Sequence, residues 1–432
     1  MAAITVTVEV AFDGSTFVDI SNKISSCRIN YGRAKPNEWD FPAGKASIIY
    51  DNRDNSLTPS HSDSLYGSSS QLIGREVRIS ASVTGGSDSY PTYLFRGFLS
   101  DLDYKAGFNT STVTISVVDG FDRLAQTSIQ SQNFAEDYTG LRIKDILDLS
   151  TVNYPSGTNP LDRDLDLGVT KAVAATGVTT NALDYIQQLA RTENGRFLVQ
   201  HAGTPSSTNK GGVLTYLSQN AAASDSGLTI SDDTSLPSGS VEARVIDLEW
   251  GSENLTNAYE FTDGTGTVHT GTSASSITKY GQRILKRTLL SDSSTTQEAG
   301  QYWIYLHDEP ALRMSKVSVD LHATTTADAE KLLHLNVLSS LDLSYLPSGS
   351  SVSIEGAYTV EGVTLDISVL DMASNEAKIV GTYSTSAFRA GYWTLGDAVL
   401  GAFPTVLAPT WVDTSSFRLG DSPRDELAVV LG

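Results

Sequence analysis

Alternation of apolar and polar side chains is clearest between residues 92 and 125. Val113, Ile115 and Val117 are apolar and alternate with the hydroxyl-bearing Thr112, Thr114 and Ser116. This is the period that buries one face of a strand. The pattern predicts two long strands joined as a hairpin, followed by a helical turn after Asp119. Gly97 interrupts the first strand, and a glycine there predicts a bulge or a close backbone approach.

A variant of this stretch recurs near the other end of the sequence. The segment YLFRGFLSDL aligns without gaps with YTVEGVTLDI, and the identical pairs are Tyr93/Tyr358, Gly97/Gly362 and Asp101/Asp366. If the match reflects a duplication, the chain contains two related β-domains with other material between them. The alternative is a chance match between two half-buried strands that each contain a glycine.

The first 240 residues predict a β-domain followed by an inserted module. Residues 1–125 form the β-domain, since further alternating strands are expected at 4–12, 26–31, 44–50 and 75–83, enough to close as a small barrel or sandwich. Residues 126–240 form an α+β module, with helices expected over 141–150 and 181–192 and strands over 196–200 and 213–217. Asn181 is the expected N-cap of the second helix.

Residues 241–386 predict a second β-domain with helices between its strands. Its first strand, 242–250, places Ile246, Leu248 and Trp250 on one face. A capping box of Thr295 and Glu298 is expected to start a helix within 291–307. The remaining predicted elements are a strand over 314–321, a helix over 327–334 and the repeated hairpin over 351–384.

Residues 387–432 differ in character from the rest. The triplet LGD occurs twice, each time two residues after an aromatic residue, Trp393 or Phe417. With Trp411 the segment is too apolar for a free tail in water, so we expect it to dock on its own body or on a partner. The predicted fold class is mainly β with α+β insertions: two related small β-barrel domains, an inserted α+β module and a C-terminal docking tail.

Composition narrows the class of protein. The 432 residues include 50 acidic and 30 basic side chains, and the net charge of −20 argues against a nucleic-acid binder, which needs Lys and Arg to contact phosphate. An acidic wall would still let a DNA duplex slide past without sticking. The single cysteine, Cys27, excludes an intrachain disulfide. We expect no signal peptide, because the sequence opens directly into a strand, and no segment that spans a bilayer.

No catalytic, cofactor-binding or metal-binding residue is assigned. The sequence contains no phosphate-binding loop, dinucleotide fingerprint, zincin helix or nucleophile elbow. Six scattered histidines and one cysteine do not assemble a Cys/His zinc site. Asp51 and Asp54 could ligate an ion, although an Asn- and Asp-rich turn is the more ordinary explanation.

A partial calcium-loop pattern occurs at Asp162, Asp164 and Asp166. However, Leu167 stands where such a loop needs glycine, and Val173 stands where it needs a bidentate carboxylate. The pattern therefore favours an ordinary loop over a calcium site.

Several segments resemble the minor tail proteins of long-tailed bacteriophages, in particular the tail hub that caps the tail tube. They are VEVAFDGSTFVDISNKISSCRINYGR, FPAGKASIIYDNRDNSLTP, LFRGFLSDLDY and TISVVDGFDRLA. The element YGQRILKRTLLSDSSTTQEAGQYWIYLHDEPALRMSKVSVDLHA resembles the strand-helix-Pro-strand unit of that family's second barrel. The resemblance covers most of residues 1–386 and rests on folding signatures.

The resemblance implies a homotrimeric ring in the tail tip of a virion, assembled in the host cytoplasm. Each chain would supply two similar barrels, so that three chains face a sixfold tube with six barrels. Expected partners are the tail tube and distal tail proteins and other tail-tip or receptor-binding proteins. Genomic DNA would pass through the lumen without specific binding, and no membrane insertion, cofactor or enzymatic activity is expected.

Two other functions remain open at this point. A receptor- or carbohydrate-binding β-protein of a phage tail would use exposed Trp and Tyr side chains in an aromatic groove. A secreted polysaccharide depolymerase would need paired carboxylates in a cleft, and nothing in the spacing of the 50 acidic residues selects a pair.

Overall fold

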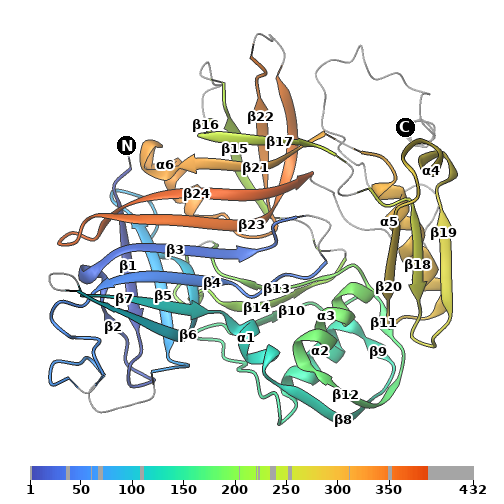
Figure 1. Cartoon of the computed structure of the whole chain (residues 1–432), viewed down its shortest axis with the longest axis horizontal. Helices are drawn as coiled ribbons and strands as arrows, with labels where there is room; N and C mark the ends of the chain where they lie inside the picture. Colours follow the sequence, from blue (N-terminus) through green and yellow to red (C-terminus); the bar gives the residue numbers. More distant parts are fainter. Residues whose placement is uncertain are drawn as a thin grey trace.

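The computed structural model describes residues 2–387, with gaps at 36–38, 60, 67–71, 108–110, 204, 220, 222–223, 234–239, 252–254, 311 and 349–352. The chain is mainly β, as the sequence predicts, with one large mixed sheet and several small helices (Figure 1). The expected docking tail, residues 387–432 with Trp393, Trp411 and Phe417, lies outside the described residues apart from Ala387, where the last strand ends.

Six strands near the N-terminus form the first part of the large sheet, in the antiparallel order β3-β4-β7-β6-β5-β1. Their bounds are Ile4–Val10 (β1), Ile24–Gly32 (β3), Lys45–Asp51 (β4), Glu76–Val83 (β5), Thr92–Ala106 (β6) and Ser111–Val118 (β7). The strand β2 (Val18–Asp19) and the 3-10 turn η1 (Ser21–Lys23) lie beside β1. Every second side chain of β1 is buried, so the predicted alternation is confirmed.

A hairpin from the C-terminal part of the chain closes these six strands into a circuit. It consists of β23 (Ile354–Asp371) and β24 (Glu376–Ala387), as the repeat predicts. β23 pairs with β3 over Gly362–Ser368, and β24 pairs with β1 at its first two residues. The first circuit therefore runs β3-β4-β7-β6-β5-β1-β24-β23 and returns to β3.

A second circuit uses the remaining part of the same hairpin. From β23 the hydrogen-bonded path leads to β22, β15 and β16, and from β24 it leads to β21 and β17. These strands span Ser224–Ser231 (β15), Ser240–Glu242 (β16), Val245–Trp250 (β17), Leu312–Asp320 (β21) and Ser339–Tyr345 (β22). The N–H groups of Ala243 and Arg244, between β16 and β17, donate to Ser231 of β15 and Ser318 of β21. The second circuit is thus closed at these two residues.

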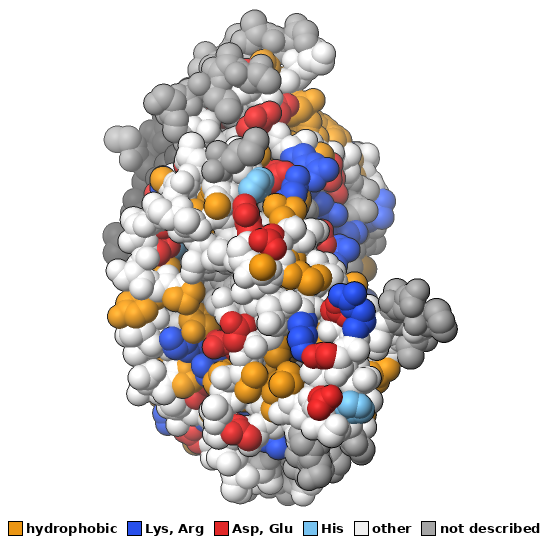
Figure 2. All heavy atoms as spheres, turned by 90° about the vertical axis from the view of Figure 1, so that its left-hand side faces the viewer, with side chains coloured by type: hydrophobic (Ala, Val, Ile, Leu, Met, Phe, Trp, Pro, Cys, Tyr) orange, Lys and Arg blue, Asp and Glu red, His pale blue; other side chains and the backbone are white. Residues whose placement is uncertain are grey.

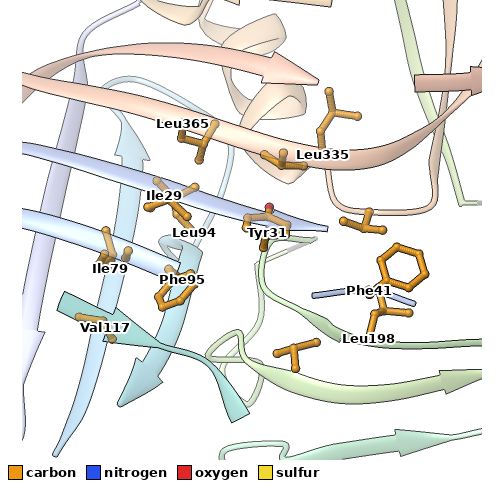
Figure 3. Packing of buried hydrophobic residues seen from close by; sticks show 14 of the residues in the cluster. Ile29, Tyr31, Phe41, Ile79, Leu94, Phe95, Val117, Leu198, Leu335 and Leu365 are labelled. Carbon is orange, nitrogen blue, oxygen red and sulfur yellow. The ribbon is translucent and has the colours of Figure 1, made fainter. Parts of the chain in front are cut away.

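One hydrophobic cluster extends through both circuits. It contains Ile4 and Val8 of β1, Ile115 of β7 and Val317 of β21, all buried. Figure 3 shows side chains from β3, β6, β23 and the inserted module packed in the same region: Ile29, Phe95, Leu365 and Leu198. The cluster therefore joins residues that are more than 300 positions apart in the sequence.

Residues 120–217 form helices and short strands against the first circuit (Figure 1). The helices are α1 (Gly120–Ala125), α2 (Thr139–Asp148) and α3 (Ala182–Thr192). The strands are β8 (Ser128–Phe134), β9 (Asp137–Tyr138), β10 (Arg163–Leu165), β11 (Lys171–Ala172), β12 (Ala175–Asn181), β13 (Arg196–Gln200) and β14 (Val213–Leu217). The side chain of Asn181 accepts from two N–H groups of the first turn of α3, so the predicted N-cap is confirmed.

A small sheet with its own core lies between β17 and β21 in the sequence. It contains β18 (Ala258–Thr262), β19 (Val268–Thr272) and β20 (Ile284–Thr288), with α4 (Ala274–Tyr280) and α5 (Ser293–His307). Tyr259, Phe261, Leu289 and Ala299 form its core. The remaining elements, the 3-10 turn η2 (Leu321–Ala323) and α6 (Thr326–His334), follow β21. The sequence pattern did not predict β18 and β19, whereas β20 is the first strand of the strand-helix-Pro-strand unit.

The predicted N-cap of α5 was wrong. Asp292, not Thr295, caps α5, and its carboxylate accepts from the Thr295 N–H at 2.8 Å. Trp250 is paired with Leu312 of β21, but 71% of its surface is exposed, whereas Ile246 and Leu248 pack against the core.

The sequence predicts either a bulge or a close backbone approach at Gly97, and the structure shows the close approach. A Cβ at this position would lie 2.4 Å from the Val118 carbonyl oxygen, so the backbones of β6 and β7 approach closely. The register shift between β6 and β7 occurs at Leu99/Asp101, beyond the glycine.

Candidate functional site

The most constrained place in the structure is the point where β23 changes partners. β23 pairs with β22 up to Thr359 and with β3 from Gly362 onward, with a bulge between Val360 and Gly362. All six residues from Tyr358 to Val363 are buried. A Cβ on Gly362 would lie 2.5 Å from the Arg33 carbonyl oxygen, so only glycine lets the two strands approach this closely.

A buried ion pair lies at this crossing. Arg33 Nε donates to Glu361 Oε2 at 2.8 Å, and the Ser386 hydroxyl donates to Glu361 Oε1 at 2.5 Å. Burial raises the pKa of Glu361, but the attraction of Arg33 outweighs it and the net pKa is lowered. The guanidinium of Arg33 also lies 4.8 Å from the ring centroid of Phe41. The pair links β3, β23 and β24 at the junction of the two circuits.

A second polar centre surrounds His201, which follows β13. Its ring stacks on Phe95 and lies against Tyr31, with centroid distances of 4.3 and 4.7 Å. His201 Nδ1 accepts from the Arg96 N–H, and Nε2 lies 3.6 Å from Asp119 Oδ2. Asp119 in turn caps α1 by accepting from the Phe121 N–H at 2.9 Å. The centre is sealed, since the His201 side chain has no exposed surface.

A third polar centre surrounds Glu193 at the end of α3. One carboxylate oxygen accepts from the Thr139 hydroxyl at 2.6 Å and from the N–H groups of Val169 and Thr170 at 2.9 Å. The Thr139 hydroxyl is also 2.9 Å from the Tyr216 hydroxyl, and burial, with the Glu193 charge next in importance, raises the pKa of that phenol. These bonds tie the loop before β11 to α2 and β14.

None of the three centres has the geometry of a catalytic site. Arg33, Glu361, His201 and Glu193 are all buried, so a substrate could not reach them. Two shallow grooves lie elsewhere, one along β17 of about 480 Å³ and one of about 510 Å³ bordered by Glu242, Arg244 and Lys378. Neither groove contains a serine, histidine and carboxylate together.

The Asp162, Asp164 and Asp166 pattern does not converge on one point. Asp162 lies 3.0 Å from Arg96 and accepts from the Gly157 N–H, while Asp166 accepts from the N–H and hydroxyl of Ser218. Asp162 and Asp166 flank β10 at its two ends, and their carboxylates bond to different parts of the chain. In the part of the chain that the structure describes, no group of three His, Cys, Asp or Glu side chains could hold a metal ion.

The other acidic pair, Asp51 and Asp54, forms ion pairs in a turn. Asp51 bonds to Arg53, and Asp54 bonds to Lys23 and to the Ser56 hydroxyl. Burial raises the pKa of Asp54, but the bonds from Lys23 and Ser56 outweigh it and bring the pKa to about 2. The ordinary turn interpretation fits this geometry.

Trp39 and Trp303, two of the described tryptophans, contact each other. Trp39 stacks on Trp303 at 4.5 Å between ring centroids, and Trp303 stacks on His307 at 4.1 Å. Their faces therefore contact one another. Trp250 is the exposed tryptophan among the described large hydrophobic residues, and it stands at the end of an edge strand.

Surface charge is mixed on the face seen in Figure 2, where acidic and basic side chains are interspersed. No helix among the described residues has both the length and the apolar character needed to cross a bilayer.

Sequence reasoning missed all three buried centres. One signal was available: Glu361 stands beside Gly362 and between the apolar residues Val360 and Val363.

Comparison with known proteins gives a consistent fold. No family model matches the sequence, and no curated protein matches it. Among solved structures, a tail protein from Neisseria meningitidis is similar with a TM-score of 0.55 and 11% identity, over 88% of this chain and 96% of that one. The 43 kDa tail protein of prophage MuSo2 from Shewanella oneidensis is similar with a TM-score of 0.50 and 12% identity, over 89% and 98%. The chain therefore shares the fold of phage tail proteins over most of its length.

Proposed function

We propose that this chain is a structural protein of a phage tail tip, namely the hub that caps the tail tube. The observation that carries the proposal is the pair of strand circuits joined by one hairpin, β23–β24. Shared fold with two phage tail proteins over nearly their whole length supports the same placement. We place the protein in the virion tail after assembly in the host cytoplasm.

The two circuits are the proposed barrels of a symmetry adapter. Residues 1–125 and 241–386 contribute most of their strands, and residues 126–240 form the module between them. In a homotrimer, three chains would present six barrels to a sixfold tail tube and a threefold face to the tip proteins. The buried ion pair and the shared hairpin would hold the two barrels at one relative orientation, which such a ring requires.

The lumen of this ring is the proposed exit channel for DNA. The formal charge of −20 supports passage without binding, because an acidic wall repels phosphate. We expect the acidic excess to be concentrated on the inner wall of the trimer. Repulsion from the outer wall matters little beyond a Debye length of about 8 Å.

A non-enzymatic role is part of the proposal. The described polar centres are sealed, and the carboxylates at the calcium-like pattern are occupied by Arg96 and Ser218. The carbohydrate-binding alternative expects free aromatic faces, whereas Trp39 and Trp303 stack on each other. No observation favours the depolymerase alternative.

The oligomeric state tests the proposal directly. The full chain should be mixed with the tube protein of its parent phage, and the mass of the complex measured by light scattering. A hub contribution of three times 46.2 kDa is expected. A dimer or tetramer would contradict the hub assignment, and so would a ring whose lumen is neutral or basic in an electron-microscopy map of the assembled tip.

A further inference from the structure

Residues 258–307, which we call the small module, have a sheet and a core of their own. The sheet β19-β18-β20 is separate from the large sheet in the described part of the chain, and the core of Tyr259, Phe261, Leu289 and Ala299 is separate from the main hydrophobic cluster. Figure 1 shows the small module at the right-hand side of the molecule. Because its core does not continue into the main cluster, the module can keep its fold while its position on the rest of the chain changes.

Leu290 connects the small module to the rest of the chain through its backbone. Its N–H donates to the Thr192 hydroxyl at 2.9 Å, and its carbonyl accepts from the Val173 N–H at 2.8 Å. Thr192 ends α3, and Val173 lies between β11 and β12. The Leu290 side chain is partly buried against the main cluster. The two backbone bonds therefore exist only while the module is docked on α3 and the residues around β11.

A pair of stacked tryptophans forms a second contact of the small module. Trp39, from the connection between β3 and β4, stacks on Trp303 of α5 with 4.5 Å between ring centroids. The guanidinium of Arg287, in β20, lies 5.7 Å from the centroid of the Trp39 ring. Stacked aromatic rings bury apolar surface, so the two tryptophans favour the docked position. We call Trp39, Trp303 and Arg287 the joint.

The joint also contains groups that oppose docking. Trp39 Nε1, Trp303 Nε1 and Arg287 Nε are buried and have no hydrogen-bond partner in the described part of the chain. Each of these N–H groups has lost its bond to water without gaining an acceptor, whereas buried donors in folded proteins are nearly always paired. Exposure of the joint to water would provide an acceptor for all three.

Charge at the joint opposes docking as well. Burial lowers the pKa of the Arg287 guanidinium, and the charge of Arg191 on α3 lowers it further, while Asp40 raises it. Asp40 binds Arg191 through both carboxylate oxygens, at 2.8 and 2.7 Å. Arg287 is therefore held near a second guanidinium, and Asp40 offsets this repulsion only in part, since Arg191 has the larger effect on Arg287.

We propose that the small module undocks as one body, with separation of Trp39 from Trp303 and loss of the two Leu290 bonds, while its own sheet stays folded. Ring stacking and the burial of Leu290 favour the docked position, whereas the unpaired donors and the two arginines oppose it. These opposing contributions leave a small free-energy difference between the docked and undocked positions, so a partner that binds one of them better would select it. The inference concerns the single chain and does not depend on the proposed trimer.

Amide hydrogen exchange of the full chain tests the proposal. The amides of Val173 and Leu290 should exchange at least about 10-fold faster than those of β18 and β4, because undocking breaks their bonds without unfolding either sheet. Trp303→Ala should speed exchange at both amides by about 10-fold and leave β18 and β4 unchanged. The matched control Gln301→Ala, at an exposed position of α5, should change neither. Exchange at the two amides that is as slow as in β18, or that does not respond to Trp303→Ala, would overturn the proposal.

Removal of an opposing group tests the balance at the joint. Arg287→Met takes away the unpaired Nε and the repulsion from Arg191, and it keeps much of the apolar length of the side chain. The variant should dock more tightly, so exchange at Val173 and Leu290 should slow by about 3- to 10-fold. Unchanged or faster exchange would mean that Arg287 does not oppose docking and would contradict the proposal.

Discussion

Arg33 and Glu361 are 328 positions apart in the sequence, yet they form a buried ion pair with 2.8 Å between Nε and Oε2. The pair stands where the C-terminal hairpin leaves one circuit of strands and enters the other. Both side chains are at most 9% exposed, so water contributes little to their solvation. Removal of either partner would leave the other charge buried and unpaired, which costs free energy. The relative position of the two circuits therefore depends on this ion pair.

Removing one partner of this pair should destabilise the protein strongly. Glu361→Ala leaves the buried Arg33 charge without its carboxylate, so we expect a loss of about 3–5 kcal/mol in the free energy of unfolding. Urea unfolding followed by circular dichroism measures it. The exposed pair Lys286–Glu260 is the matched control, and Lys286→Ala should cost only about 0–1 kcal/mol. Equal losses at the two sites would contradict the assignment of the junction as the constrained point.

The same carboxylate should make stability depend on pH. In the folded chain the pKa of Glu361 is below the ordinary value of 4.5, because the attraction of Arg33 outweighs the upward effect of burial. The stability it contributes is therefore present above the unfolded pKa and is lost as the pH falls through the folded pKa. Between about pH 6 and pH 3, the wild-type chain should lose more free energy of unfolding than Glu361→Gln does. Parallel pH profiles for the two proteins would show that Glu361 does not titrate in this way.

Gly362 should not tolerate a side chain. A methyl group there would lie 2.5 Å from the Arg33 carbonyl oxygen, a backbone atom that cannot move freely, so we expect Gly362→Ala to cost about 1–3 kcal/mol. Gly251→Ala is the control, because a Cβ there meets nothing within 4 Å, and it should change stability by less than about 0.5 kcal/mol. Thermal unfolding distinguishes the two. A neutral Gly362→Ala would mean that β3 and β23 can separate at little cost.

The single thiol should be unreactive in the folded protein. Cys27 lies in the core of β3, and burial raises the pKa of its thiol to about 12. The thiolate is the reactive form, so labelling by a disulfide reagent near neutral pH should be slow until the chain unfolds. The control is the same reaction in denaturant, where labelling should be complete within minutes. Rapid labelling of the native chain would indicate that β3 opens readily.

The protein should show no cell-wall hydrolase activity. Its described polar centres are sealed from solvent, and its acidic side chains at the calcium-like pattern bond to Arg96, Gly157 and Ser218. Zymography on the host cell wall, with lysozyme in a parallel lane, should give no lytic band for this chain. A clear band that disappears on mutation of one carboxylate would overturn the non-enzymatic assignment.

The sequence by itself determined the elements whose signals are local. Alternation within β1 and β7 follows from the pleat of a strand, and the cap at Asn181 follows from the unsatisfied N–H groups of the first turn of α3. The strand-rich fold class followed from the same period. The repeat around Gly97 and Gly362 correctly located the second hairpin, while the relation between the two β-domains stays a prediction.

Only the tertiary structure decided how the hairpin is used. Pairing of β23 with β3 joins residues more than 300 positions apart, and no local period reports which distant strand edge a hairpin will meet. The buried centres at Glu361, His201 and Glu193 were hidden for the same reason, since each depends on partners from other elements. Exposure of Trp250 was also decided there, because burial of a strand's side chains depends on what packs over them and not on the strand's own sequence.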